Sequence, residues 1–148
     1  MSKVTLFFYR LAYCLYKLHL PVIPQLINIV FVRILFGCQI GLGAKIGKNV
    51  NLGYGGLGCV IHSRAILGDN VRVGTNVTIG GTSQKVDVPI IGDNCILSTG
   101  CKVIGPIHIQ NNCVIGANAV VISDIPSNSL CVGMPAKIIK SNISPLDY

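Results

Sequence analysis

A six-residue repeat of aliphatic side chains constrains this 148-residue chain more than any other feature. Counting from Ile61 to Val121 in steps of six, ten of eleven residues are apolar, and the exception is Lys85. The residue four places after each of these is mostly small or branched, and three of the Cys residues fall there. This period matches neither an α-helix nor an antiparallel hairpin, and it predicts short strands separated by corners.

Three such hexads would form an 18-residue coil, and stacked coils would build a triangular prism with strands about 4.8 Å apart. Gly often follows the leading aliphatic residue, as expected at a tight corner. Residues 18 apart should then stack, which places Cys95 over Cys113. The same spacing predicts one corner column made of His62, Gly80, Ser98 and Gly116.

Two segments interrupt this regular stack. An earlier block of hexads runs from Ile40 to Leu52, and the next leading residue, Ile61, follows after nine residues instead of six. Residues 54–59 (YGGLGC) are therefore expected to bulge from the repeat. The second expected loop is 82–89 (TSQKVDVP), which contains the single polar leading residue.

The composition narrows the class of function. A chain that is 51% hydrophobic and 11% charged is not disordered. Its net charge of +7 comes from scattered Lys and Arg without interleaved aromatic residues, which argues against nucleic-acid binding. We expect instead an anionic ligand, such as a nucleotide-bearing cofactor.

The seven Cys residues show no CxxC spacing and no paired His, so the sequence predicts neither a metal site nor a disulfide framework. They are interpreted as buried thiols in a reducing compartment. No signal peptide is evident near the start, and the longest charge-free apolar stretch there is too short to span a bilayer. The expected location is cytoplasmic, with peripheral contact to the inner membrane as an open alternative.

The first 36 residues differ from the rest, because they contain no Gly and no acid but seven of the nine aromatic residues. We expect a helix over about residues 3–18, a break at residues 21–24, and a second short helix to about Phe36. Lys3, Arg10 and Lys17 are seven apart and so share one helix face. This segment either caps the first coil or contacts another subunit, or it is a basic amphipathic element at the membrane.

The hexads, VTIGG (77–81) and the terminal VGMPAKII (132–139) resemble the hexapeptide-repeat acyltransferases. Within that family the resemblance is to the serine acetyltransferases and their relatives in surface-polysaccharide synthesis. It covers about residues 37–140 and implies a left-handed parallel β-helix, a homotrimer and acetyl-CoA as the donor. The expected division is a helical segment at 1–36, the β-helix at 37–126 and a C-terminal strand and tail at 127–148.

The resemblance also implies that a His acts as general base on an acceptor hydroxyl, which attacks the thioester in a cleft between subunits. His62 is the candidate, because it occupies a corner position where the repeat otherwise prefers Gly. His19 lies in the N-terminal segment, and His108 falls at an outward position of its hexad. Asp87, in the irregular loop, is the candidate carboxylate to orient His62, whereas Asp69 and Asp93 occur in matching GDN corners.

By the same resemblance, small residues should line the groove for the cofactor, and two Lys residues near the C-terminus should meet its phosphates. These residues are Gly80, Gly81, Ser98, Thr99, Gly100, Gly116, Ala117, Lys137 and Lys140. The alternative is that the Gly residues serve turns alone and the Lys residues are merely solvated.

Two positions depart from the serine acetyltransferases. Where that family has a His in an LDH-type segment, this chain has LGY, ending at Tyr54; where it has a second His before a Pro, this chain has Val88. The predicted acceptor is therefore a sugar hydroxyl of a surface polysaccharide. The alternatives are a serine O-acetyltransferase of cysteine biosynthesis and a non-catalytic β-helix scaffold.

Overall fold

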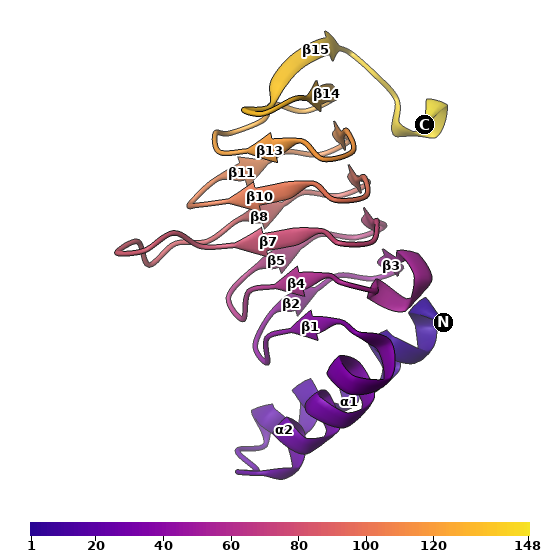
Figure 1. Ribbon diagram of the computed structural model, residues 1–148, viewed down its shortest axis with the longest axis vertical. Helices are drawn as coiled ribbons and strands as arrows, with labels where there is room; N and C mark the ends of the chain where they lie inside the picture. Colours follow the sequence, from indigo (N-terminus) through magenta and orange to yellow (C-terminus); the bar gives the residue numbers. More distant parts are fainter.

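In the computed structural model, which describes residues 1–148, short parallel strands wind into a triangular prism with helices at one end (Figure 1). The predicted fold class, a left-handed parallel β-helix with an N-terminal helical segment, is confirmed. The leading aliphatic residues, such as Ile61 and Leu97, point inward and are buried. Cys95 stacks on Cys113, as predicted, because β9 and β12 pair in register beside them.

Three sheets form the sides of the prism, and each is named here by its order along the chain. The first sheet contains β1 (Gln39–Ile40), β4 (Val60–Ile61), β7 (Thr78–Gly80), β10 (Lys102–Ile104) and β13 (Val120–Val121). The second contains β2 (Lys45–Ile46), β5 (Ile66–Leu67), β8 (Ile90–Ile91) and β11 (His108–Ile109). The third contains β3 (Asn51–Leu52), β6 (Arg72–Val73), β9 (Ile96–Leu97), β12 (Val114–Ile115), β14 (Ser129–Val132) and the antiparallel β15 (Lys137–Ser141).

Corner 1 joins the first sheet to the second, corner 2 the second to the third, and corner 3 the third to the first. Both predicted interruptions are present. Residues 54–59 leave the repeat at corner 3, where η2 (Gly53–Gly56) lies, and 82–89 project from corner 1 between β7 and β8 (Figure 1).

The predicted corner column is wrong beyond its second member. His62 lies next to Gly80, but Gly80 then pairs with Ile104, which is 24 residues further on. The loop at 82–89 inserts six residues into this coil, so strands that pair across it are 24 residues apart instead of 18. Ser98 and Gly116 instead follow Gly74 at corner 3.

The Cys residues are all free thiols, and six of them are buried. Desolvation in the core raises the pKa of Cys38 and of Cys101 to about 12. These thiols stay protonated at neutral pH and act as small apolar side chains. The interpretation of all seven as buried is wrong for Cys14 alone, which is exposed on the N-terminal helix.

Corner 2 is held by a ladder of Asn side chains along the edge of the prism. The amide Nδ2 of every Asn but the last donates to the Oδ1 of the Asn one coil further on, at 3.0 to 3.2 Å. The same residues have positive φ, which Asn tolerates better than other non-Gly residues. The members are Asn49, Asn70, Asn94, Asn112 and Asn128. Beside this ladder the carboxylates of Asp69 and Asp93 accept backbone N–H groups, which supports their interpretation as turn residues.

Replacing Asn94 tests the two roles of the ladder separately. Asn94→Ala removes two hydrogen bonds and replaces Asn by a residue that tolerates φ 56° less well, and we expect the free energy of unfolding to fall by about 2 kcal/mol. Asn94→Gly removes the bonds but accepts this φ, so its loss should be about 1 kcal/mol. Urea denaturation of both variants provides the measurement. Equal losses would show that backbone conformation contributes nothing here.

The N-terminal helices cap the open end of the first coil. Helix α1 (Ser2–Lys17) lies under the prism, and α2 (Ile23–Ile27) continues into the π-helix η1 (Asn28–Ile34). Tyr9 Oη donates to the carbonyl oxygen of Ala44 at 2.7 Å, and Asn28 Nδ2 donates to that of Ile40 at 2.8 Å. These bonds satisfy backbone groups that have no neighbouring strand, as the capping interpretation predicts. None of the helices is both long and apolar enough to cross a membrane.

Candidate functional site

Corner 1 carries the sequence-predicted base. His62 follows β4 directly, and its backbone N–H donates to the carbonyl oxygen of Ile79 at 2.9 Å. This register places Gly80 beside His62 on the next coil. Gly80 has no side chain with which to cover the half-buried imidazole.

The imidazole makes one hydrogen bond, and that bond defines its tautomer. The backbone N–H of Arg64 donates to Nδ1 of His62 at 3.1 Å. Nδ1 therefore carries no proton, and the neutral ring has its proton on Nε2. To accept a proton at Nε2, the ring has to leave this contact and take the other tautomer. The sequence did not predict this contact with Arg64, because the hexad pattern does not determine hydrogen bonds within a local turn.

The Gly residues of the prism occupy either crowded or open positions. This difference distinguishes a Gly that packing between coils requires from a Gly that leaves space for a ligand. At Gly74 a Cβ would lie 2.6 Å from the backbone nitrogen of Thr99, and at Gly92 it would lie 2.8 Å from that of Asn111. Such contacts leave no room for a side chain. At Gly80 the nearest atom would be Cδ1 of Ile104 at 3.6 Å, an ordinary contact. Packing therefore does not require a Gly at this position. The absence of a side chain there leaves the backbone accessible to a ligand.

The other predicted cofactor residues lie elsewhere. Ser98 and Thr99 line a groove of about 590 Å³ at corner 3, together with Arg72. Gly100 has φ +75° and Gly116 is packed against the next coil, so the fold itself requires a Gly at both. Thus Gly80 and Gly81 belong to corner 1, whereas Ser98, Thr99, Gly100, Gly116 and Ala117 belong to corner 3. The first sheet separates the two groups within one chain.

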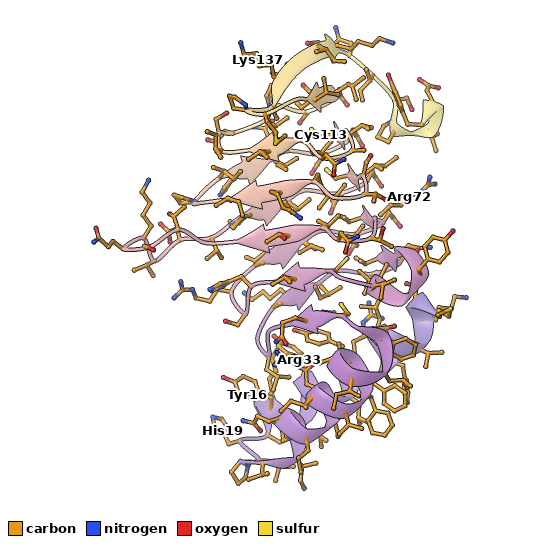
Figure 2. All side chains as sticks on the ribbon, viewed as in Figure 1. Tyr16, His19, Arg33, Arg72, Cys113 and Lys137 are labelled. Carbon is orange, nitrogen blue, oxygen red and sulfur yellow. The ribbon has the colours of Figure 1, made fainter.

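Lys137 and Lys140 lie on β15, at the end of the prism opposite to the helices. Figure 2 shows Lys137 there, on the same side of the view as the projecting loop. Both side chains are exposed. Their position leaves them available to an anionic group beyond the last coil.

The projecting loop covers a pocket of about 450 Å³ on the second sheet. Its polar lining residues are Arg64, Asp87 and His108, and the rest are mainly apolar. Asp87 thus faces the same space as His108, while the hydrogen bond of His62 goes to Arg64. The structure does not bring Asp87 to the imidazole that it was predicted to orient. The chain contains no group of three His, Cys, Asp or Glu side chains that could hold a metal ion.

Comparison with known proteins identifies relatives of this chain. The family described as bacterial transferase hexapeptide (six repeats) matches residues 89–123. A serine acetyltransferase of Synechococcus elongatus is 37% identical over 145 residues, which are 95% of this chain and 59% of that protein. The chain is therefore similar to the hexapeptide-repeat transferases. A serine acetyltransferase of Staphylococcus aureus is 40% identical over 112 residues, 74% of this chain and 52% of that protein.

Solved structures extend the match of this hexapeptide-repeat chain to three dimensions. The serine acetyltransferase of Brucella abortus in complex with coenzyme A has a TM-score of 0.88 and 28% identity, over 94% of this chain and 56% of that one. The soybean serine acetyltransferase apoenzyme has a TM-score of 0.85 and the same identity. The chain spans little more than half the length of the relatives that it matches.

Proposed function

We propose that the chain is an acetyl-CoA-dependent O-acetyltransferase whose reaction takes place at corner 1. The observation that carries this proposal is the open corner, where an imidazole lies beside a Gly that packing does not require. A hexapeptide-repeat relative of known structure binds coenzyme A, which supports a thioester donor. His62 is proposed as the base that removes the proton from the acceptor hydroxyl.

In the proposed reaction the acceptor oxygen attacks the thioester carbonyl carbon while Nε2 of His62 takes the hydroxyl proton. The tetrahedral intermediate then collapses, the C–S bond breaks, and the leaving thiolate takes the proton from the imidazolium. His62 needs its Nδ1–H tautomer for the first step, so the ring releases the Arg64 N–H contact when the acceptor binds. Gly80, its neighbour on the next coil, has no side chain to oppose that rotation.

The acceptor favoured by the comparisons is L-serine, because the curated relatives that match the chain are serine acetyltransferases. The predicted polysaccharide acceptor finds no such support among them. A sugar hydroxyl remains the second candidate for the acceptor because of one observation. Tyr54 and Val88 stand where the serine acetyltransferase pattern has its two His residues, and Val88 is buried in the pocket wall.

The two groups of predicted cofactor residues support assembly into a trimer. Within one chain they lie at corners 1 and 3, with the first sheet between them. A ligand that touches both groups has to lie between two copies, corner 1 of one against corner 3 of the next. A cyclic trimer provides three equivalent clefts of this kind.

An acceptor screen tests the proposal. The protein is given acetyl-CoA with free L-serine, with monosaccharides or with oligosaccharides, and the release of CoA thiol is followed. We expect thiol release above the acceptor-free control, with serine giving the higher kcat/KM. Turnover with sugars alone would restore the polysaccharide acceptor. If no acceptor is acetylated and calorimetry detects no binding of acetyl-CoA, the chain is a scaffold.

A further inference from the structure

The face of the helical segment that points away from the prism, here called the outer helical face, is apolar and exposed. Phe7 is 62% exposed, Ile34 72% and Leu35 62%. Large apolar side chains at such exposure are unusual in groups, and a group of them marks an interaction surface. The members that carry the argument are Phe7, Leu11, Leu18, Leu26, Ile34 and Leu35.

Helix α1 has three distinct sides. Leu6 and Tyr9 are buried against the prism, while Phe7, Leu11 and Leu18, the residue that follows the helix, lie on the far side and are exposed. Lys3, Arg10 and Lys17, seven residues apart, form a row that the helical period places beside this exposed stripe. The basic row therefore borders the apolar stripe.

The second helical segment continues the same surface. Pro24, Asn28 and Val32, spaced by four, face the prism and are buried. Most of the remaining circumference is apolar, and a helix that is apolar on nearly all sides belongs in a protein core or in contact with lipid. Phe8 of α1 stacks on Phe31 with ring centroids 4.3 Å apart, which joins the two segments side by side.

Charge decides which partner fits this face. The first acid of the chain is Asp69, so every charged side chain of the helical segment is basic. Figure 2 shows Arg33 at the same end of the molecule as Tyr16 and His19. A second copy docking through the same face would bring like charges together, with no carboxylate on either side to balance them. The phosphates of an anionic bilayer are the complementary partner.

We propose that the outer helical face binds the surface of an anionic lipid bilayer. The apolar residues enter the boundary between headgroups and acyl chains, and the flanking Lys3 and Lys17 side chains contact the phosphates, while Arg10 donates to the carbonyl oxygen of Gly47 at 2.8 Å. The prism then stands on the membrane, with its last coil and β15 furthest from the lipid (Figure 1). This surface is independent of the proposed catalytic corner.

Vesicle sedimentation of the full chain tests the proposal. With phosphatidylcholine vesicles that contain phosphatidylglycerol, we expect binding that weakens as salt is raised, and little binding to phosphatidylcholine alone. Ile34→Asp should lower the partition coefficient at least about tenfold. Leu146→Asp, at an 88% exposed apolar residue of the opposite end, should leave it unchanged. Circular dichroism checks that both variants are folded.

A pair of charge variants separates docking from general attraction. Lys3→Gln with Lys17→Gln should weaken binding about fivefold per charge, whereas Lys137→Gln with Lys140→Gln, which has the same net charge, should have a much smaller effect. Equal effects of the two double variants, or no binding by the unaltered chain, would overturn the proposal. If Ile34→Asp instead reduces the oligomer measured by light scattering and vesicle binding is absent, a second copy covers the face.

Discussion

Replacing His62 with Ala is expected to lower kcat by about 10²- to 10⁴-fold while the KM for acetyl-CoA stays close to that of the unaltered protein. The reason is that, in the proposed reaction, the imidazole acts on the acceptor hydroxyl and does not hold the donor. Thiol release under saturating acetyl-CoA measures kcat, and calorimetry measures donor binding separately. Unchanged thermal unfolding would show that the loss is chemical, since the side chain is only half-buried.

The other two His residues provide the controls. His19→Ala alters a residue of the helical segment and should leave turnover unchanged. His108→Ala alters the loop pocket that also contains Asp87, and we expect a smaller loss than for His62→Ala. A larger loss for His108→Ala would move the base from the corner to the pocket beneath the loop, with Asp87 as its neighbour.

Gly92→Ala is expected to lower the free energy of unfolding by about 3 kcal/mol, which is a large share of the stability of a chain this size. Its Cβ would lie 2.8 Å from the backbone nitrogen of Asn111, and backbone in a parallel coil has nowhere to move. Chemical denaturation measures the change. A loss below about 1 kcal/mol would show that the coils separate more easily than their packing indicates.

Gly80→Ala is the matched substitution at an open corner. Its Cβ makes only ordinary contacts, so stability should change by less than about 1 kcal/mol. The new methyl group would occupy space proposed for the donor, and we expect acetyl-CoA affinity to fall about tenfold. Unaltered binding would show that Gly80 does not contact the donor. The pair thus distinguishes a Gly kept for packing from one kept for a ligand.

The period of the sequence was sufficient to predict the prism, because one inward aliphatic residue per hexad is what each side requires. It also located the bulge before Ile61, since a step of nine breaks the phase. It could not show that the loop at 82–89 inserts six residues into the coil. An insertion of six residues preserves the phase of the six-residue repeat. Lys85, the one polar residue among the leading positions, was the indication of this insertion. The error in the corner column follows from that loop alone.

The candidate site was less predictable for a related reason. His62 stood out because it replaces a corner Gly, but its hydrogen bond to Arg64 depends on the local turn. The pocket shared by Asp87 and His108 depends on how the loop folds back over the second sheet. Crowding at each Gly depends on the neighbouring coil, whose alignment was mispredicted across the loop at 82–89. Periodicity reports which way a side chain points and not what lies opposite to it.

The two ends of the prism determine whether other molecules can add to it end to end. A parallel coil exposes unpaired N–H and C=O groups at its first and last turns. An uncovered turn would form hydrogen bonds with a turn of another molecule. Here Tyr9 and Asn28 occupy carbonyl groups of the first turn, and β15 runs antiparallel against β14 at the other. Loss of either closure would leave unpaired backbone N–H and C=O groups at that end. Another molecule would then pair with them, as strands pair along a fibre. The helices and the reversed strand therefore protect the chain against polymerisation.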